Sequence, residues 1–314
     1  MSKSLDRLSL LETFVRIVDA GSISAAARDV GLSQPSVSRQ LAELESRFQT
    51  QLIQRTTHTL SLTAAGSELL LDARRLLDDW TALEEKHIES TKTLRGKLKV
   101  VAPVALGQCH LIDIVLRLQR ENPLLSLSWQ LKDEEIRFAE TGCDCWIKIG
   151  AIADSSLSIE PLAKVERLVV AAPTLLNAWP KNPKPQTLNT LPCIALDPFE
   201  GKQIPLQNTK EKTAKRTAAK RTIVIRPNVR MSTNNIFALH RMAVAGLGIA
   251  VLPKWFIQSE LESGKLIDLL PDWRAPTLTI HIGLLNGRYR AYKLQQFVNL
   301  MKAEIVNIPG IDQV

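Results

Sequence analysis

Polar side chains that can read a DNA base pair gather where one predicted helix begins, at Gln34, Ser36, Ser38 and Arg39. A glutamine amide can pair with adenine, an arginine guanidinium with guanine, and a serine hydroxyl with a base or a phosphate. On one exposed helix face, these groups suit the major groove of double-stranded DNA. The same side chains would also fit a plain helical hairpin that exposes them to solvent.

A small residue, a turn residue and an apolar anchor are spaced as two packed helices require. Ala27, Gly31 and Val37 follow one another at intervals of four and six residues. Ala27 lets the helices approach, Gly31 can leave helical geometry, and Val37 anchors the second helix on the first. This spacing predicts a helix-turn-helix.

Flanking residues predict where these helices begin. Ser24 is expected to cap a helix over residues 25–30, and Ser33 to cap the next one, whose first turn tolerates Pro35. An earlier amphipathic helix is expected to end near Ala20-Gly21.

The second helix of the pair continues along an apolar face and leads into a predicted wing. The apolar positions of that face are Val37, Leu41, Leu44 and Phe48. After it, short apolar runs at 52–53 and 60–62 bracket a polar turn and predict two strands of a wing.

A seven-residue repeat of apolar positions runs through residues 64–92. Leu69, Leu76 and Leu83 stand seven apart, and Ala73, Trp80 and His87 each follow four residues later. Such a stripe is typical of a helix that pairs with a second copy. A helix packed on its own domain would show the same stripe.

From Gly96 onward, predicted strands and helices alternate, which indicates an α/β architecture with mostly parallel sheets. The predicted strands are 98–102, 125–131, 145–149, 168–172, 223–225, 249–252 and 278–285. The predicted helices are 106–120, 134–140, 235–246 and 290–305.

The net charge of +8 arises from one segment of the 314-residue chain. Residues 201–230 hold nine Lys or Arg and one Glu, so the rest of the chain is balanced. Within this segment TAKRT is followed by AAKRT, a near-duplicate. We consider three roles for it: a solvated loop, an additional non-specific DNA contact, or a contact to a protein or an anionic ligand.

Five motifs together resemble LysR-type transcriptional regulators over nearly the whole chain. The N-terminal ones are GSISAAARDVGLSQPSVSRQLAELE and the wing QRTTHTLSLTAAG, and the later ones are GKLKVVAP, TGCDCWIKIG and VAGLGIAVLP. The resemblance implies a fold of mixed α+β and α/β class. It consists of a winged helix-turn-helix (1–63), a dimerising linker helix (64–92) and an effector-binding domain (93–314). That last domain is expected to contain two Rossmann-like subdomains of periplasmic-binding-protein type, about 93–163 with 272–314, and about 164–271.

The resemblance also assigns residues to the DNA interface. Those at the recognition helix and the wing are Ser33, Gln34, Pro35, Ser36, Ser38, Arg39, Arg55, Thr56 and Thr57. The expected partner is double-stranded DNA with an inverted repeat, bound by a homodimer that assembles into a homotetramer. Relatives commonly carry a basic residue at the position of His58 and a Glu at that of Ala64, so one wing cation is missing here.

A small-molecule effector is expected between the two subdomains. The residues assigned to it are Ala102, Val104, Ala105, Ile149, Gly150, Ser232, Thr233 and Asn234. The loop at 102–106 lacks the hydroxyls common in relatives, but backbone N–H groups at the next helix start could hold an anion. Helix capping is the alternative role of Ser232, Thr233 and Asn234.

Other site classes are not expected. Cys143 and Cys145 lack the second Cys or His pair of a zinc site, Gly246 and Gly248 do not open a helix after a strand, and no catalytic triad is apparent. We therefore expect no catalytic residue, metal or cofactor. With neither an apolar span nor a signal peptide in the sequence, we expect a cytoplasmic protein without membrane contact. The alternative function is a small-molecule binding protein whose helical N-terminus serves only assembly.

Overall fold

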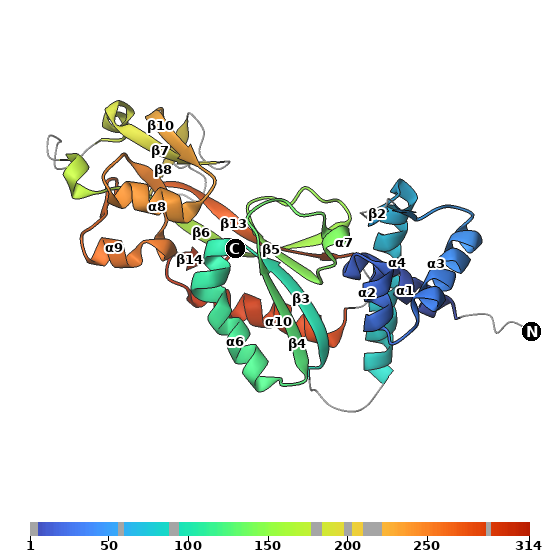
Figure 1. Ribbon diagram of the computed structural model, residues 1–314. Helices are drawn as coiled ribbons and strands as arrows, with labels where there is room; N and C mark the ends of the chain where they lie inside the picture. Colours follow the sequence, from blue (N-terminus) through green and yellow to red (C-terminus); the bar gives the residue numbers. More distant parts are fainter. Residues whose placement is uncertain are drawn as a thin grey trace, which may run out of the picture.

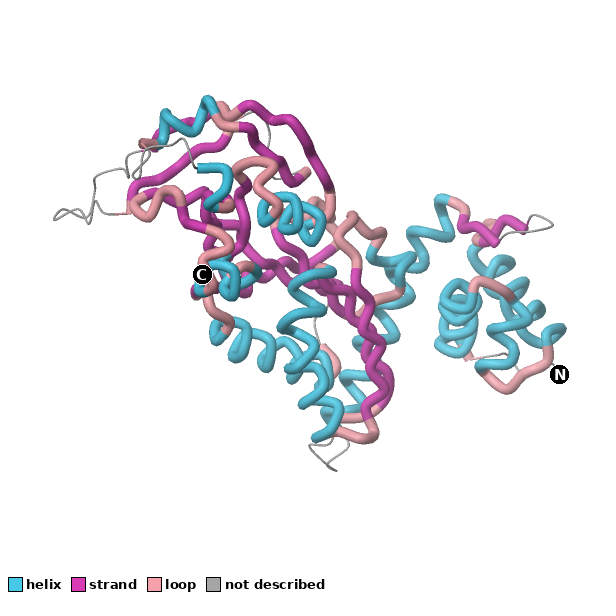
Figure 2. The backbone as a smooth tube through the Cα atoms, turned by 60° about the vertical axis from the view of Figure 1, so that its left-hand side comes forward, coloured by secondary structure: helices cyan, strands magenta, loops and turns pink. Residues whose placement is uncertain are grey.

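The computed structural model describes the chain in seven stretches: 6–55, 60–87, 94–176, 184–197, 203–209, 222–286 and 290–314. Figure 1 shows the N-terminal helices at one end of an elongated molecule and a long, twisted sheet running away from them. Figure 2 shows the strands of that sheet passing between helices along most of the molecule's length. The wing tip at 56–59 and the duplicated basic motif up to Arg221 lie outside the described residues.

The N-terminal unit consists of three helices, a two-stranded wing and the first half of a long helix. Its elements are α1 (Arg7–Ala20), α2 (Ile23–Asp29), α3 (Gln34–Phe48), β1 (Ile53–Arg55), β2 (Leu60–Leu62) and α4 (Ala64–His87). Leu10, Phe14 and Ile17 of α1 are fully buried against Val37 and Leu41 of α3. Both α1 and α3 bury residues at helical spacing, so the amphipathic pattern of the sequence becomes one core.

The sheet region, from residue 94 to the C-terminus, contains the remaining described strands. They are β3 (Gly96–Ala102), β4 (Leu125–Leu131), β5 (Cys145–Ile149), β6 (Leu157–Ala171), β7 (Pro192–Leu196), β8 (Ile204–Asn208), β9 (Thr222–Ile225), β10 (Asn228–Thr233), β11 (Ala250–Pro253), β12 (Ile267–Asp268), β13 (Trp273–Leu285) and β14 (Ile311–Asp312). The central order is β11-β6-β13-β5-β3-β4. Strands β7 and β10 form a separate parallel pair.

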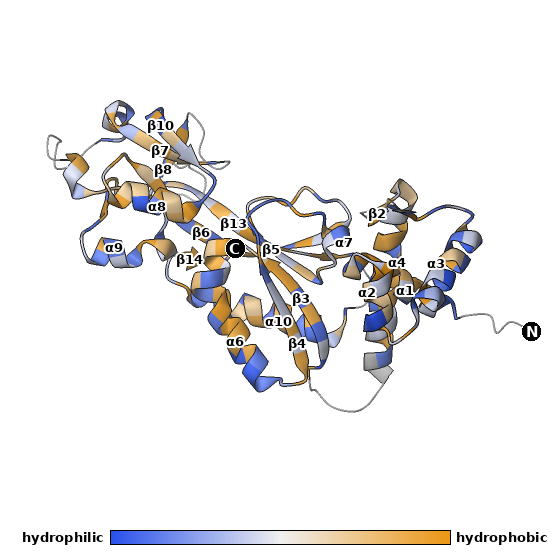
Figure 3. Cartoon of the chain, in the orientation of Figure 1, coloured by the Kyte–Doolittle hydropathy of each residue, from blue (hydrophilic) through white to orange (hydrophobic). Residues whose placement is uncertain are grey.

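Helices cover this sheet region, and Figure 3 shows hydrophobic residues concentrated along its central strands. The helices are α5 (Val104–Leu106), which continues through a π turn (Gly107–Leu111) into α6 (Ile112–Glu121), then α7 (Phe138–Thr141), α8 (Ile236–Val244), α9 (Gln258–Glu262) and α10 (Tyr292–Glu304). Short 3-10 turns occupy Pro173–Leu176, Pro185–Thr190, Lys254–Phe256 and Ile305–Asn307.

Strands β6 and β13 each serve more than one hydrophobic core. The first part of β6 contributes Leu162 and Val165 to a cluster that includes β3, α6 and α10. Further along, Val169 and Val170 point to two different clusters on opposite faces of the sheet. Side chains of a strand alternate between faces, so the continuous apolar run of β6 fills two cores at once. These long strands tie the sheet region together.

The prediction of mostly parallel sheets is wrong. Strand β3 pairs in parallel with β4 and β5, but β6 and β13 run antiparallel to each other and to their other neighbours. The predicted strand 168–172 is the end of the fifteen-residue β6, and the predicted strand 278–285 is part of the longer β13. Long strands that return along the same path pair antiparallel, which local hydrophobic patterns do not reveal.

Three local predictions also need correction. Ser22 caps α2, through a hydroxyl that accepts from the Ala25 N–H, and Ser24 is exposed. Phe48, in the last turn of α3, is 51% exposed, so the buried part of the apolar face ends at Leu44. The predicted helix 134–140 is reduced to the single turn of α7.

Candidate nucleic-acid interface and effector site

The helix-turn-helix forms from α2 and α3 with the contacts that the spacing predicts. Ala27 is 4% exposed and Val37 fully buried, while Gly31 adopts a φ of +68° in the turn between the helices. That conformation suits glycine because it has no Cβ. Ser33 caps α3 as predicted, since its hydroxyl accepts from the Ser36 N–H at 3.3 Å.

The start of α3 presents the predicted DNA-reading side chains to solvent. Ser33, Gln34, Pro35 and Arg39 are exposed, and Ser36 and Ser38 are half-buried. The Ser36 hydroxyl lies 2.8 Å from that of Ser33 and accepts from the Arg39 guanidinium at 3.4 Å. These contacts orient Arg39 along the exposed face while leaving most of its donors available.

A carboxylate fastens the wing to α3. Glu45 accepts from the backbone N–H groups of Leu52 and Ile53, at 2.9 and 3.3 Å. Strand β1 then pairs antiparallel with β2, with Arg55 opposite Leu60, as the wing prediction requires. The backbone of Arg55 is therefore placed at the end of β1, whereas Thr56 and Thr57 lie outside the described residues.

The N-terminal core contains a buried polar pair that the sequence did not predict. The Thr13 hydroxyl on α1 donates to the Gln40 side-chain oxygen on α3, and the two residues are only 5% and 8% exposed. Gln40 lies at helical spacing with the buried apolar residues of α3, so periodicity could predict that its side chain points inward. Periodicity could not predict that Thr13 would be its partner.

The predicted effector residues fall at the carboxyl ends of two parallel strand pairs. Ala102 ends β3, Val104 and Ala105 begin α5, and Ile149 ends β5, which pairs in parallel with β3. Gly150 directly follows. At the second pair, Thr233 of β10 stands opposite Leu196 of β7. Ligands of α/β proteins commonly bind at this edge of parallel strands.

Helix α8 is capped by Asn235, which directly follows the predicted effector residues Ser232, Thr233 and Asn234. Asn235 accepts from the Ala238 N–H at 3.1 Å, and its own N–H donates to the Thr233 hydroxyl at 3.1 Å. Ser232 and Asn234 are exposed beside this cap. Helix capping therefore involves Asn235 and Thr233, and Asn followed by an apolar helical run was the available signal.

An internal carboxylate occupies the first N–H group of α5. Asp133, in the loop after β4, accepts from the Val104 N–H at 2.9 Å. Burial raises the pKa of Asp133, against the opposing effect of this hydrogen bond. The backbone N–H group at which an anion could bind is therefore already occupied by a carboxylate of the protein itself.

An aromatic row joins the helices that follow the two predicted effector segments. The ring of His110 in the π turn packs edge to face on Trp255, with the ring centroids 5.3 Å apart. Trp255 packs in the same way on Phe256 at 5.3 Å between centroids, and Phe256 on Phe237 of α8 at 5.1 Å. Such edge-to-face pairs stabilise beyond the area they bury. The adjacent Trp255 and Phe256 were the signal, although their partners lie far away in sequence.

The described residues contain no metal cluster, and the buried Cys143 thiol is unreactive. No group of three or more His, Cys, Asp or Glu side chains among them could hold a metal ion. The four cysteines are free, and burial raises the pKa of the Cys143 thiol to about 12, with Asp144 adding to the rise. Thiolates are the reactive and metal-binding form, so this thiol stays inert. None of the described helices is long and apolar enough to cross a membrane.

Comparisons with known proteins agree with the arrangement of these elements. Residues 8–67 match the model of the bacterial regulatory helix-turn-helix protein, lysR family, and residues 91–305 match the LysR substrate binding domain. The HTH-type transcriptional regulator PtxR of Pseudomonas aeruginosa is 27% identical over 98% of both chains. Among solved structures, a full-length OxyR variant from Pseudomonas aeruginosa has a TM-score of 0.71 at 18% identity, and ArgP from Mycobacterium tuberculosis has 0.68 at 17%, each covering 99% of both chains. Both parts of the chain match in the same order, and the chain therefore belongs to the LysR family of transcriptional regulators, with a DNA-binding helix-turn-helix followed by an effector-binding domain.

Proposed function

We propose that α3 enters the major groove of the operator and reads its bases. The side chains proposed to face the DNA are Ser33, Gln34, Pro35, Ser36, Ser38 and Arg39, with Arg55, Thr56 and Thr57 of the wing at the flanking backbone. The observation that carries this proposal is the exposed start of α3, where Ser36 orients Arg39. An oriented guanidinium loses little freedom when it pairs with guanine.

The second part of the proposal concerns assembly. The C-terminal half of α4 exposes Leu76 by 50%, Trp80 by 45% and Leu83 by 38%, in one stripe. A second copy of α4 would bury this stripe and place two recognition helices in successive major grooves. We therefore propose a homodimer through residues 64–92, an operator with an inverted repeat, and a dimer of dimers as the homotetramer.

The third part concerns the effector, which we place within residues 93–314. The residues proposed to contact it are Ala102, Val104, Ala105, Ile149, Gly150, Ser232, Thr233 and Asn234. Their position at the ends of parallel strand pairs supports this assignment. The effector then changes DNA binding through its different affinity for two arrangements of the protein. We assign the protein to the cytoplasm, where its DNA lies, and assign it no catalytic residue and no cofactor.

Arg39→Ala tests the recognition helix. This change removes a bidentate base contact and is expected to weaken specific operator binding by about 1–3 kcal/mol. The measurement is a mobility-shift titration with DNA flanking the gene, at two salt concentrations. Arg16→Ala serves as the matched control, since Arg16 is an exposed arginine on α1.

Two results would contradict the proposal. If the Arg39 variant and the wild-type chain bound the operator with equal affinity, α3 would not be the helix that reads the bases. Failure of the wild-type chain to bind any flanking DNA specifically would favour the alternative, a small-molecule binding protein with an N-terminal assembly unit.

A further inference from the structure

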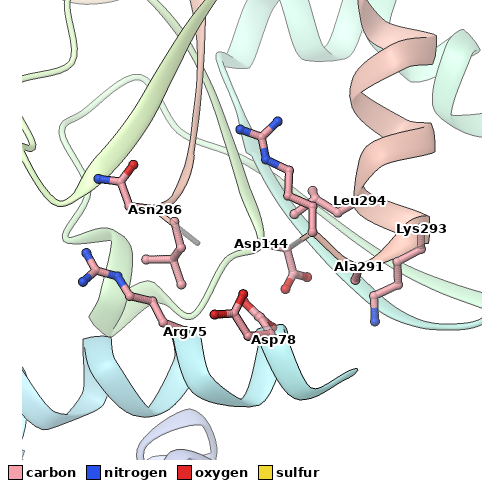
Figure 4. Close-up of a pocket in the computed structure, with 10 residues that line it drawn as sticks. Arg75, Asp78, Asp144, Asn286, Ala291, Lys293 and Leu294 are labelled. Carbon is pink, nitrogen blue, oxygen red and sulfur yellow. The ribbon is translucent and has the colours of Figure 1, made fainter. Parts of the chain in front are cut away.

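The inner face of α4 meets the sheet region at a pocket lined by charged side chains. Figure 4 shows Asp78 of α4 and Asp144, just before β5, pointing into this pocket from opposite walls. The pocket is narrow, with a volume of about 30 Å³. Arg75 and Asp79 of α4 line the same wall as Asp78, and Arg290 and Lys293 line the far side.

One of the two carboxylates is fixed in place. Asp144 accepts from the Lys99 backbone N–H at 2.7 Å, and its own N–H donates to the Lys99 carbonyl at 2.8 Å. These bonds hold Asp144 to the edge of β3, so it cannot swing away when Asp78 approaches. The docking of α4 therefore brings two acidic groups together.

Further contacts of α4 hold it in this position. Arg74 of α4 is paired with Asp19 of α1 at 2.5 Å, and this pair rests on Gly142. A Cβ at Gly142 would lie 2.6 Å from the nearest atom of each partner. Arg75 donates to the Ser156 carbonyl at 3.1 Å. The N-terminal unit is thus attached to the sheet region around the two carboxyl groups.

We propose that Asp78 and Asp144 form a proton-operated latch, in which proton uptake holds α4 against the sheet region and proton loss releases it. The latch goes beyond the function proposed above, because it operates within one chain and needs neither DNA nor effector. Release would free the N-terminal unit to change its position relative to the effector-binding domain.

Several charged groups face the pair, and their effects oppose one another. Arg74 and Lys293 favour the ionised form of Asp78, while Asp144 and Asp79 disfavour it. Asp19 disfavours the ionised form of Asp144, which Arg74 and Lys293 favour. Arg75 and Arg290 add positive charge at the rim of the pocket. The cations reduce the repulsion without cancelling the cost of burial.

The direction of the pH effect follows from these environments. Burial is the largest cause that raises the pKa of Asp78 from 3.8 to about 7, and the negative charge of Asp144 is the next largest. Burial raises the pKa of Asp144 as well. A released α4 would return Asp78 to its ordinary pKa. Docking is therefore strongest at a pH below 3.8, the ordinary pKa of Asp78, and this stabilisation is lost as the pH rises through about 7. Between pH 6 and 8, the ratio of docked to released chains should fall about tenfold.

Single-molecule energy transfer on the full chain measures this ratio. Dyes are attached at Arg16→Cys on α1 and Glu121→Cys on α6, both exposed positions, in a Cys109→Ser background. The three remaining cysteines are buried. An excess of unlabelled chain restricts energy transfer to dyes on the same chain. Two populations whose ratio falls about tenfold between pH 6 and 8 are expected.

Three variants separate the latch from a general pH effect. Asp78→Asn mimics the protonated group and should stay docked at both pH values. Asp144→Asn keeps an acceptor for Lys99 and should move the midpoint to lower pH, since the like charge is gone. Glu84→Gln, an exposed position on α4, is the matched control and should titrate like the wild type.

The latch is overturned by any of four results. These are a wild-type ratio that does not change between pH 6 and 8, an Asp78→Asn variant that retains the wild-type response, the same variant being released at both pH values, and an Asp144→Asn variant with an unchanged midpoint. All measurements are made without DNA, so none depends on the operator assignment.

Discussion

At the scale of single residues, the N-terminal core depends on one polar pair among apolar side chains. Thr13 and Gln40 satisfy each other where water is excluded. A buried group that loses its partner costs more than the net value of the bond it made. This pair therefore joins α1 to α3 in one orientation and supports the angle at which α3 is presented.

Gln40→Ala should lower the free energy of unfolding by about 1–3 kcal/mol, because the Thr13 hydroxyl loses its acceptor and a cavity remains. Urea denaturation of the full chain measures this. Gln34→Ala, at an exposed glutamine of the same helix, should change stability by less than about 0.5 kcal/mol. Equal losses in the two variants would show that the buried pair is not stabilising.

At the scale of elements, α4 has two distinct faces. Leu76, Trp80 and Leu83 share one exposed face, whereas Arg74 and Asp78 lie on the other side of the helix, about 160° away at 100° per residue. The first part of the heptad stripe instead packs in the N-terminal core, where Ala73 is 1% exposed. The packing interpretation of the stripe thus applies to the first half of the helix, and the proposed pairing concerns the second half. The proposed pairing with a second copy would leave the latch face free.

Trp80→Lys should break the proposed α4 contact and lower the oligomeric state, because it places a charge in the middle of the apolar stripe. Sedimentation velocity of the full chain gives the oligomeric state, and circular dichroism checks that helix content is retained. Leu247→Lys, at a leucine that is 51% exposed and far from α4 in sequence, is the control. A Trp80 variant that sediments like the wild type would place the dimer contact elsewhere.

At the scale of the whole molecule, the N-terminal unit contacts the sheet region through a glycine. Gly142 ends α7 with a φ of +62°, and Asp19 and Arg74 approach it closely. Glycine suits the backbone conformation here, and its lack of a Cβ leaves room for the ends of the Arg74 and Asp19 side chains. The ion pair of α1 and α4 can therefore rest directly on the backbone of α7.

Gly142→Ala should lower the docked fraction at pH 6, because the new Cβ would displace the ends of the Arg74 and Asp19 side chains and weaken their pair. The same energy-transfer pair reports the docked fraction. Gly264→Ala is the matched control: Gly264 has a φ of +70° but nothing within 4 Å of the added Cβ. Both variants should lose about 1–2 kcal/mol of stability through the left-handed backbone, and only the first should lose docking. Equal docked fractions would contradict this role of Gly142.

The sequence alone determined the local parts of this protein. Caps and helical periodicity predicted α3 from Ser33 and the burial of Val37, and apolar runs predicted β3, β4 and β5 close to their observed bounds. Caps, turns and periodicity depend on residues within a few positions of one another, so they can be read along the chain. The family motifs also predicted the order of the two matched regions along the chain.

Only the tertiary structure decided which distant residues meet. It pairs Thr13 with Gln40, places Asp78 of α4 in one pocket with Asp144, and lets β6 and β13 return antiparallel through two cores. No local pattern marks these partners, because a polar or apolar residue looks the same in sequence whichever neighbour later covers it. Burial and charge at such meetings exist only once the chain has folded, and there the ordinary carboxyl groups of Asp78 and Asp144 gain their raised pKa values.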